Sequence, residues 1–208
     1  MGRPHRVEVP GGTYHVSTRG SNRQPIFWTD EDRWLFLRMV GIVTVKYAWT
    51  VLAYCLMTNH FHLVLQIAES GLSAGMQWLN GTASRATNQR HGRSAHLFRN
   101  RFSSVLVESD AHLFVACRYV VLNPVRAGLC AHPDEWPWSS YRATAGLQPS
   151  PAFLADGDLL RRFAPSVPEA RRRYIKFVAD GLADAIAAAD DDRHTIVAVS
   201  DTASEARR

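Results

Sequence analysis

Apolar and polar residues alternate along four short segments of the chain, and a period of two residues is typical of β-strands. The predicted strands cover residues 13–20, 48–57, 60–67 and 102–109. Between and after them, apolar residues recur every three to four positions, which predicts amphipathic helices. The predicted helices cover residues 29–47, 72–91 and 109–123.

Local signals fix the ends of these helices. Thr29 is a predicted N-cap, because three acidic residues follow it in the first turn, where the helix dipole favours anions. Ser73 is the predicted cap of the second helix, and Ser109 or Asp110 begins the third. That third helix is expected to end near Asn123, because Pro124 disfavours helical geometry in the residue before it. Within the first helix, the expected apolar stripe includes Trp34, Leu37 and Val45.

The order of these elements is β-α-β-β-α-β-α, which predicts an α+β fold of the ferredoxin-like, split βαβ type. We expect an antiparallel sheet of four to five strands with the helices on one face, followed by a helical extension. The predicted division places the α+β domain at 1–145, the helical extension at 146–182 and a disordered tail at 183–208. The tail has few aromatic residues and six acids against three arginines.

The segment "MTNHFHLVLQ" places two histidines, His60 and His62, on the third predicted strand. Residues i and i+2 of a strand project from the same face, so the two imidazoles point the same way while Phe61 points the other way. Two neutral imidazoles side by side can offer two nitrogens to one cation. On this pattern alone, a pair of histidines on a solvated sheet face is the more common arrangement.

The charge is uneven along the chain. The net charge is +5 and the pI is about 9.4, but the acidic tail hides a body of about +8. No Asp or Glu occurs between Ser70 and Val107, although five arginines do, and Arg19 projects from the first strand. Such a body favours a polyanionic partner, most often nucleic acid. The residues predicted to contact such a partner are Arg19, Arg85, Arg90, Arg93, Arg99 and Arg101.

Composition excludes several classes of protein. Hydrophobic residues make up 46% and charged residues 21%, as in soluble globular proteins. No apolar run approaches the length of a membrane span, so we expect a cytoplasmic protein without membrane association. The three cysteines form no CxxC pair, which fits a reducing compartment.

Tyr119 and Asn123 are four residues apart in the third predicted helix, so both would lie on one side of it. A tyrosine at the margin of a core, with its ring buried and its hydroxyl in water, is a common structural feature. The spacing alone therefore does not assign a function to Tyr119.

Four blocks together resemble the HUH single-strand transposases of the IS200-like (Y1) family, and most of all the branch of REP-associated tyrosine transposases. The blocks are "YHVSTRGSNRQPIF", "YCLMTNHFHLVL", "RYVVLNPVRAGL" and "WPWSSYRATAG", and they occur in this order. The resemblance covers about residues 5–145, with a weaker likeness to about residue 182. Four blocks in order are far more specific than any one of them.

The resemblance implies a metal-dependent enzyme that cleaves and transfers single-stranded or hairpin DNA through a 5′-phosphotyrosine intermediate. His60, His62 and Asn123 match the positions that hold a divalent cation, expected to be Mg²⁺ or Mn²⁺, and Tyr119 matches the catalytic tyrosine. A phenol keeps its proton at neutral pH, so the nucleophile needs help to lose it, and the nearby cation can supply that help. The expected assembly is a monomer or a homodimer.

Other interpretations remain open. The chain could be a non-catalytic binder of single-stranded nucleic acid derived from such a transposase. A cupin would need a glutamate soon after the histidine pair, where Gln66 and Ile67 stand. Tyr54 and Tyr141 are alternative nucleophiles. The spacing around Tyr54 also suits a core position, and Tyr141 lies in the block "WPWSSYR", where a structural role is expected. Exposed bases could stack on Trp78, Trp136 or Trp138, although core packing is the more common role of a tryptophan.

Overall fold

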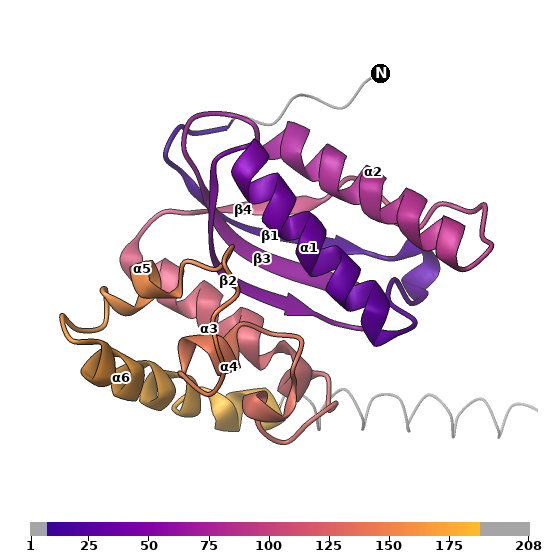
Figure 1. Ribbon diagram of the computed structural model, residues 1–208. Coiled ribbons are helices and arrows are strands. Elements are labelled where there is room, and N and C mark those ends of the chain that lie inside the picture. Colours follow the sequence, from indigo (N-terminus) through magenta and orange to yellow (C-terminus); the bar gives the residue numbers. More distant parts are fainter. Residues whose placement is uncertain (1–7, 188–208) are drawn as a thin grey trace, which may run out of the picture.

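The computed structural model describes residues 8–187, and its centre is a four-stranded antiparallel sheet (Figure 1). The strands lie in the order β2-β3-β1-β4, so β3 and β1 are central and β4 is at an edge. Their bounds are β1 (Thr13–Arg19), β2 (Trp49–Leu56), β3 (His60–Ile67) and β4 (Ser103–Val107). The predicted α+β fold with its split βαβ order is confirmed.

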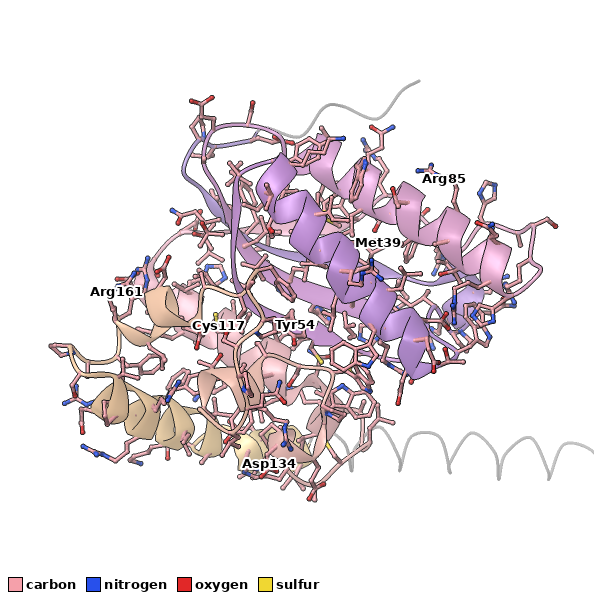
Figure 2. The ribbon with its side chains drawn as sticks, viewed as in Figure 1. Met39, Tyr54, Arg85, Cys117, Asp134 and Arg161 are labelled. Carbon is pink, nitrogen blue, oxygen red and sulfur yellow. The ribbon has the colours of Figure 1, made fainter. Side chains whose placement is uncertain are left out.

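Helices cover both faces of this sheet, which corrects the expectation that they share one face. α1 (Asp30–Lys46) and α2 (Leu72–Arg90) pack side by side on one face, and α3 (Asp110–Arg126) packs on the other (Figure 1). Figure 2 shows Arg85 of α2 and Cys117 of α3 on opposite sides of the strands. The reason is that β2 and β3 carry apolar residues on both faces, among them Cys55 and Val64, so each face needs a cover.

Two apolar cores result, one on each side of the sheet. Beneath α1 and α2, the strands bury residues such as Val16, Phe61 and Leu63. Beneath α3, the core includes Cys55, Val64 and the inner side of α3, and it continues into the C-terminal helices. This second core takes Leu52, Ala53 and Cys55 from β2 and Val64 from the middle of β3, so part of this face is left for polar residues.

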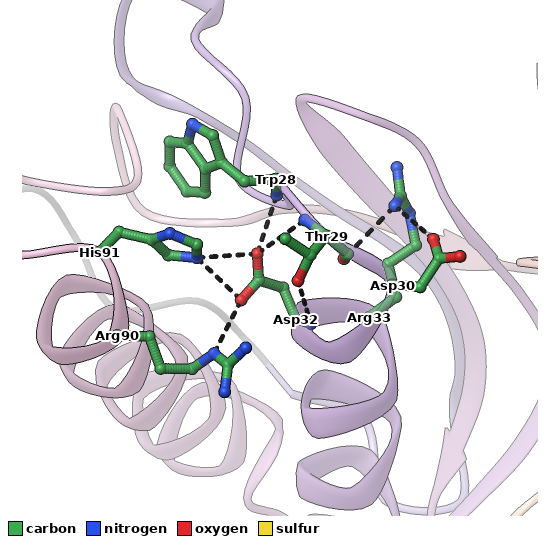
Figure 3. A network of polar contacts seen from close by, with 7 residues as sticks. All are labelled: Trp28, Thr29, Asp30, Asp32, Arg33, Arg90 and His91. Carbon is green, nitrogen blue, oxygen red and sulfur yellow. Dashed lines mark hydrogen bonds and ion pairs between the residues drawn. The ribbon is translucent and has the colours of Figure 1, made fainter.

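The start of α1 is fixed by a polar network (Figure 3). Thr29 caps the helix, as expected, and forms a capping box in which the Asp32 carboxylate accepts from the Thr29 backbone N–H. The same buried carboxylate lies 3.1 Å from Nε of Arg90 and 2.9 Å from Nε2 of His91, at the end of α2. Asp32 therefore ties the beginning of one helix to the end of the other.

The apolar stripe of α1 differs from the expected one. Leu37 is buried as predicted, but Trp34 is 61% exposed and Val45 is 86% exposed. The buried side of the helix is formed by Phe36, Leu37, Met39, Val40 and Val43. Both faces of α1 carry apolar residues, so periodicity did not separate the inner side from the outer one.

α2 begins at Leu72 rather than after a Ser73 cap. Gly71 is the N-cap with a φ of 121°, a backbone conformation that favours glycine. The Glu8 carboxylate, which precedes β1, accepts from the backbone N–H groups of Gly71, Leu72 and Ser73. This distant carboxylate replaces the local cap because it satisfies three free N–H groups at the positive end of the helix.

α3 begins after Ser109, whose side chain accepts from the backbone N–H of His112, but it does not end near Asn123. The helix continues through Pro124 to Arg126 and stops at Gly128, which has a φ of 63°. The Gly128 N–H donates to the Val125 carbonyl and the Leu129 N–H donates to the Pro124 carbonyl. This Schellman arrangement ends the helix at the glycine, so Asn123 lies inside it.

The C-terminal segment packs on α3. It contains α4 (Tyr141–Thr144), α5 (Asp156–Leu160) and α6 (Val167–Ala179), together with the short 3₁₀ helix η2 (Pro133–Glu135); a similar turn, η1 (Ser21–Arg23), follows β1.

The division of the chain into domains at residue 145 stays a prediction. The disordered tail was expected from residue 183, but residues 182–187 are helical and Ala185 is buried, so this boundary was wrong. Residues 188–208 lie outside the described residues.

No helix between residues 8 and 187 is long and apolar enough to cross a lipid bilayer.

Candidate functional site

The candidate site lies on the α3 face of the two central strands. A tight hairpin turn joins β2 to β3, with the Met57 N–H donating to the His60 carbonyl across it. β3 therefore begins at His60, and His60 and His62 project from the same face, as predicted. Their ring centroids are 5.0 Å apart. Ser17 of β1 stands opposite His62 and Arg19 stands opposite His60.

Hydrogen bonds at Asn59 orient the His60 ring and engage one of its two nitrogens. Nδ1 lies 2.7 Å from the amide oxygen of Asn59. The nitrogen of the same amide donates to the Arg23 carbonyl at 3.0 Å, which fixes its orientation and leaves its oxygen toward His60. His60 Nδ1 then carries the proton, and Nε2 keeps a lone pair.

His62 has a comparable arrangement with a third histidine. His15 of β1 places Nε2 2.9 Å from His62 Nδ1, and the two rings stack at a centroid distance of 5.1 Å. His62 Nε2 is buried and has no hydrogen-bond partner in the described part of the chain. A buried nitrogen without a partner is costly. His62 Nε2 is therefore a candidate metal ligand.

α3 brings Tyr119 and Asn123 to this group. The Asn123 side-chain nitrogen donates to the Tyr119 carbonyl at 3.1 Å, so the amide oxygen is left for other contacts. Asn123 is buried, and its side chain lies close enough to His60 to raise the pKa of that histidine. The helix thus places a neutral oxygen ligand beside the histidine pair, one turn after the tyrosine.

Tyr119 lies over the histidines and remains accessible. Its ring meets those of His15 and His62 edge-on, at centroid distances of 5.7 and 5.8 Å. The side chain is 40% exposed, so a substrate can reach it from solvent. The Arg126 guanidinium carbon lies 5.4 Å from the centre of the tyrosine ring.

Burial keeps the histidines neutral. It lowers the pKa of His60 to about 4; the Arg19 charge adds to the shift and the Asn123 side chain opposes it. Burial, together with the charges of His60, His15 and Arg19, holds the pKa of His62 well below its usual value. Burial and the charge of His112 lower the pKa of His15. Neutral imidazoles are the form that binds metal ions.

The donor set suits a hard or borderline cation with open coordination positions. Among residues 8–187, no group of three or more His, Cys, Asp and Glu residues is arranged to hold a metal ion. The candidate set therefore depends on the Asn123 amide as its third member. Two imidazole nitrogens and one amide oxygen carry no charge, so a bound divalent ion would keep its full charge for a substrate.

A family model described as "Transposase IS200 like" matches residues 8–123, which are 116 of the 208 residues. The chain belongs to the IS200-like transposase family. Members of this family are tyrosine transposases. The matched region contains His15, His60, His62 and Tyr119 and ends at Asn123.

Two individual relatives support this assignment. A Haemophilus influenzae protein named as a REP-associated tyrosine transposase is 24% identical over 152 residues, covering 68% of this chain and 86% of the relative. The solved structure of a REP-associated tyrosine transposase bound to a REP hairpin has a TM-score of 0.60 and 16% identity. The match covers 74% of this chain and 92% of that one, and it shows a shared fold.

The alternative tyrosines lie elsewhere in the fold. Tyr54 is buried on the opposite face of the sheet, and burial raises its pKa to about 12. Tyr141 is buried in the second core, and burial raises its pKa as well. The three tryptophans considered for base stacking also pack against the cores: Trp138 is buried, and Trp78 and Trp136 are partly buried.

The predicted DNA-contacting arginines lie in three different surroundings. Only Arg19 lies at the candidate site. Arg90 and Arg93 make internal contacts, with Asp32 and with Trp28 and Gln24 respectively. Arg85 lies on α2, and Arg99 and Arg101 lie in the segment before β4, where the Arg99 N–H donates to the Arg19 carbonyl.

Two residues that lie at the candidate site, His15 and Arg126, were not among the predicted site residues. His15 lies on the face of β1 that the strand period assigns to it, but its partner depends on the register between β1 and β3. Arg126 follows Tyr119 by seven residues, a spacing that would have placed it on the same side of the helix had Pro124 not been expected to end α3.

Proposed function

We propose that this protein cleaves single-stranded DNA and rejoins it to another end through a covalent link to Tyr119. The observation that carries the proposal is the convergence on one sheet face: the tyrosine ring contacts His62 edge-on, while Asn123 of the same helix reaches His60. Three neutral ligands and one accessible nucleophile are the parts that this reaction needs.

His60, His62 and Asn123 would hold the cation through two Nε2 atoms and one amide oxygen. The orphaned, buried Nε2 of His62 is the feature of this chain that best fits such a role. When bound, Mg²⁺ or Mn²⁺ supplies Lewis-acid polarisation of the scissile phosphate. His15 accepts the proton of His62 Nδ1 in a hydrogen bond, which leaves His62 Nε2 free and orients its ring.

Tyr119 attacks the phosphorus of the scissile phosphodiester. A bond forms between the tyrosine oxygen and phosphorus, and the bond from phosphorus to the 3′ oxygen breaks. The phenol proton is lost as the nucleophile attacks, and the departing 3′ oxygen takes up a proton. The new phosphotyrosine ester retains the energy of the broken bond, so a 3′-hydroxyl can reverse the step without another energy source.

Positive charge around the site would orient the strand. Arg19 lies beside the histidines, and Arg126 lies against the face of Tyr119, so both can contact phosphate oxygens. A relative of the same fold binds a REP hairpin. Single-stranded or hairpin DNA with palindromic repeats is therefore the substrate class that we propose.

The test is a covalent adduct that survives denaturing electrophoresis. Labelled single strands from the DNA flanking the gene are incubated with the protein and Mg²⁺ or Mn²⁺. We expect an adduct with the parent protein and none with Tyr119→Phe. Tyr47→Phe is the matched control, because Tyr47 is half-buried on the other side of the molecule and should leave the adduct unchanged.

The same assay separates the alternatives. An adduct that persists in Tyr119→Phe and disappears in Tyr54→Phe or Tyr141→Phe would move the nucleophile. Tight binding of single strands without any adduct, in the presence of either metal, would replace the catalytic proposal by a non-catalytic binding function.

A further inference from the structure

A cavity lined by both apolar and polar residues lies on the opposite side of the sheet from Tyr119. Its volume is about 450 Å³, and it is bounded by α2 and the segment that leads into β4. This size is in the range of small-molecule sites in proteins. The lining residues that carry its chemistry are Gln77, Asn80, Phe98, Asn100, Arg101 and Phe102.

These residues combine amides, aromatic rings and one cation. Three carboxamides offer both donors and acceptors, and Gln77 and Asn100 are exposed to solvent. The Asn80 side-chain nitrogen donates to Thr18 Oγ1 at 3.3 Å, while its oxygen is buried and has no hydrogen-bond partner in the described part of the chain. No acidic residue occurs from Ser70 to Val107. The lining therefore suits a flat, neutral ligand with several hydrogen-bonding groups, attached to an anion.

An unpaired nucleotide has this chemistry. Carboxamides pair with the donor and acceptor edges of bases, and aromatic rings stack on their faces. Arg101, exposed at the cavity, can contact the attached phosphate. A purely apolar ligand would leave the amides without partners, and a cationic one would meet Arg101.

The cavity also lies close to the proposed active site, through β1. Thr18 faces the cavity side and contacts Asn80, while its neighbour Arg19 faces the histidines. The cavity segment is attached to the same end of β1, because the Arg99 N–H donates to the Arg19 carbonyl and Phe98 forms a β-bridge with Gly20. A strand that passes around this edge can present one nucleotide to the cavity and another to Tyr119.

We infer that this cavity is a base-recognition pocket, which holds one unpaired nucleotide of the DNA strand that Tyr119 cleaves. The inference rests on the proposed function for the identity of the strand. The pocket reads the base edge through the exposed amides of Gln77 and Asn100, while Asn80 forms part of its wall, so it contributes sequence preference at a position away from the scissile phosphate.

The test asks whether the pocket residues and one particular nucleotide contribute to the same binding energy. Binding of fluorescent single strands from the gene flanks is measured by anisotropy, in a Tyr119→Phe background that prevents covalent trapping. Each nucleotide is replaced in turn by an abasic one. We expect one abasic position to weaken binding at least tenfold, and this penalty to disappear in Gln77→Ala and Asn80→Ala.

Gln89→Ala is the matched control, because Gln89 is an exposed glutamine of α2 outside the cavity. It should keep the full abasic penalty. If Asn80→Ala fails to fold, the exposed Gln77 and Asn100 carry the test through their alanine variants. Equal abasic penalties in the parent and in the pocket variants would overturn the inference.

The adduct assay distinguishes a failure of the pocket inference from a failure of the proposed strand cleavage. Adduct formation in the Tyr119-containing protein, without coupling between the pocket variants and any abasic position, overturns the pocket alone. Coupling at one position, in a protein that forms no adduct with any strand, supports the pocket and contradicts the proposed strand cleavage.

Discussion

The two faces of the central strands are built from alternate residues of the same short segments, but they differ in kind. On the α1 and α2 face, β1 and β3 bury Val16, Phe61 and Leu63 completely. On the α3 face, the neighbouring residues are His15 and His62, and one nitrogen of His62 has no partner among residues 8–187. A register shift of one residue would exchange the two sets. The comparison indicates that the face covered by α1 and α2 stabilises the fold. The face covered by α3 carries polar residues that pack less well but can bind a cation.

Adjacent residues of β3 give the largest expected contrast. Phe61→Ala should lower the free energy of unfolding by about 3–5 kcal/mol, because it removes a ring from a filled core. His62→Ala should cost less than half as much, because it removes a buried nitrogen that has no partner, yet it should weaken Mn²⁺ binding by at least about a hundredfold. Urea denaturation and calorimetric titration with Mn²⁺ measure the two effects.

The proposed difference between the two faces would be wrong if Phe61→Ala and His62→Ala had the same effects on stability and on Mn²⁺ binding. A His62→Ala protein that loses as much stability as Phe61→Ala and still binds Mn²⁺ normally would make the histidine a core residue.

The Asp32 network gives the next largest effect and belongs to the stabilising side. Asp32→Asn should lower the free energy of unfolding by about 3 kcal/mol at pH 7, because it leaves Arg90 and His91 without a buried anion. Burial raises the pKa of Asp32, but hydrogen bonds from His91, from the Trp28 and Thr29 amides and from Arg90 outweigh it and leave this pKa lowered.

A carboxyl group with a lowered folded-state pKa contributes stability above its unfolded pKa of about 3.9, and this contribution is lost as the pH falls through the folded value. The gap between the parent and Asp32→Asn should therefore narrow below about pH 4. Asp30→Asn is the control: Asp30 is exposed and pairs with Arg33 at the surface, so its loss should change stability by less than about 0.5 kcal/mol. A gap that stays constant down to pH 2 would contradict this account of Asp32.

His15 gives the smallest of the three effects and sharpens the account of the polar face. His15→Phe keeps a ring of similar shape but removes the nitrogen beside His62, so Mn²⁺ affinity should fall about tenfold. His15→Gln restores an acceptor and should recover part of the loss. Nitrogen NMR of the metal-free imidazoles reports which nitrogen of His62 carries the proton.

A merely structural role for His15 predicts a different result. Unchanged Mn²⁺ affinity in His15→Phe, or an equal loss in the glutamine variant, would show that this histidine does not orient His62.

Much of the fold could be predicted because its signals are local. The strand alternation, the Thr29 and Ser109 caps and the histidine pair each depend on residues within a few positions of one another. The features that were missed depend on distant residues. Glu8 caps α2 from 63 residues away, and Ala185 is buried by its place on the second core.

The candidate site also divides into residues that local signals predict and residues that depend on distant contacts. His60 and His62 were placed on one face by the strand period, and Tyr119 and Asn123 were placed on one side of a helix by their spacing. His15 could not be added without the β1–β3 register, because only that pairing brings it beside His62. Pro124 misplaced the end of α3, since the Schellman arrangement at Gly128 outweighs the local effect of the proline. The side of the sheet on which α3 packs is a tertiary property that β2 and β3, apolar on both faces, leave undecided.

The most direct test of the central claim is the position of a bound ion in crystals soaked with Mn²⁺ and examined by anomalous scattering. The account predicts one strong peak bonded to Nε2 of His60, Nε2 of His62 and the amide oxygen of Asn123, on the same side of the sheet as Tyr119. A fully soaked crystal with no peak at the histidines, or with its strongest peak on the α1 and α2 side, would contradict it.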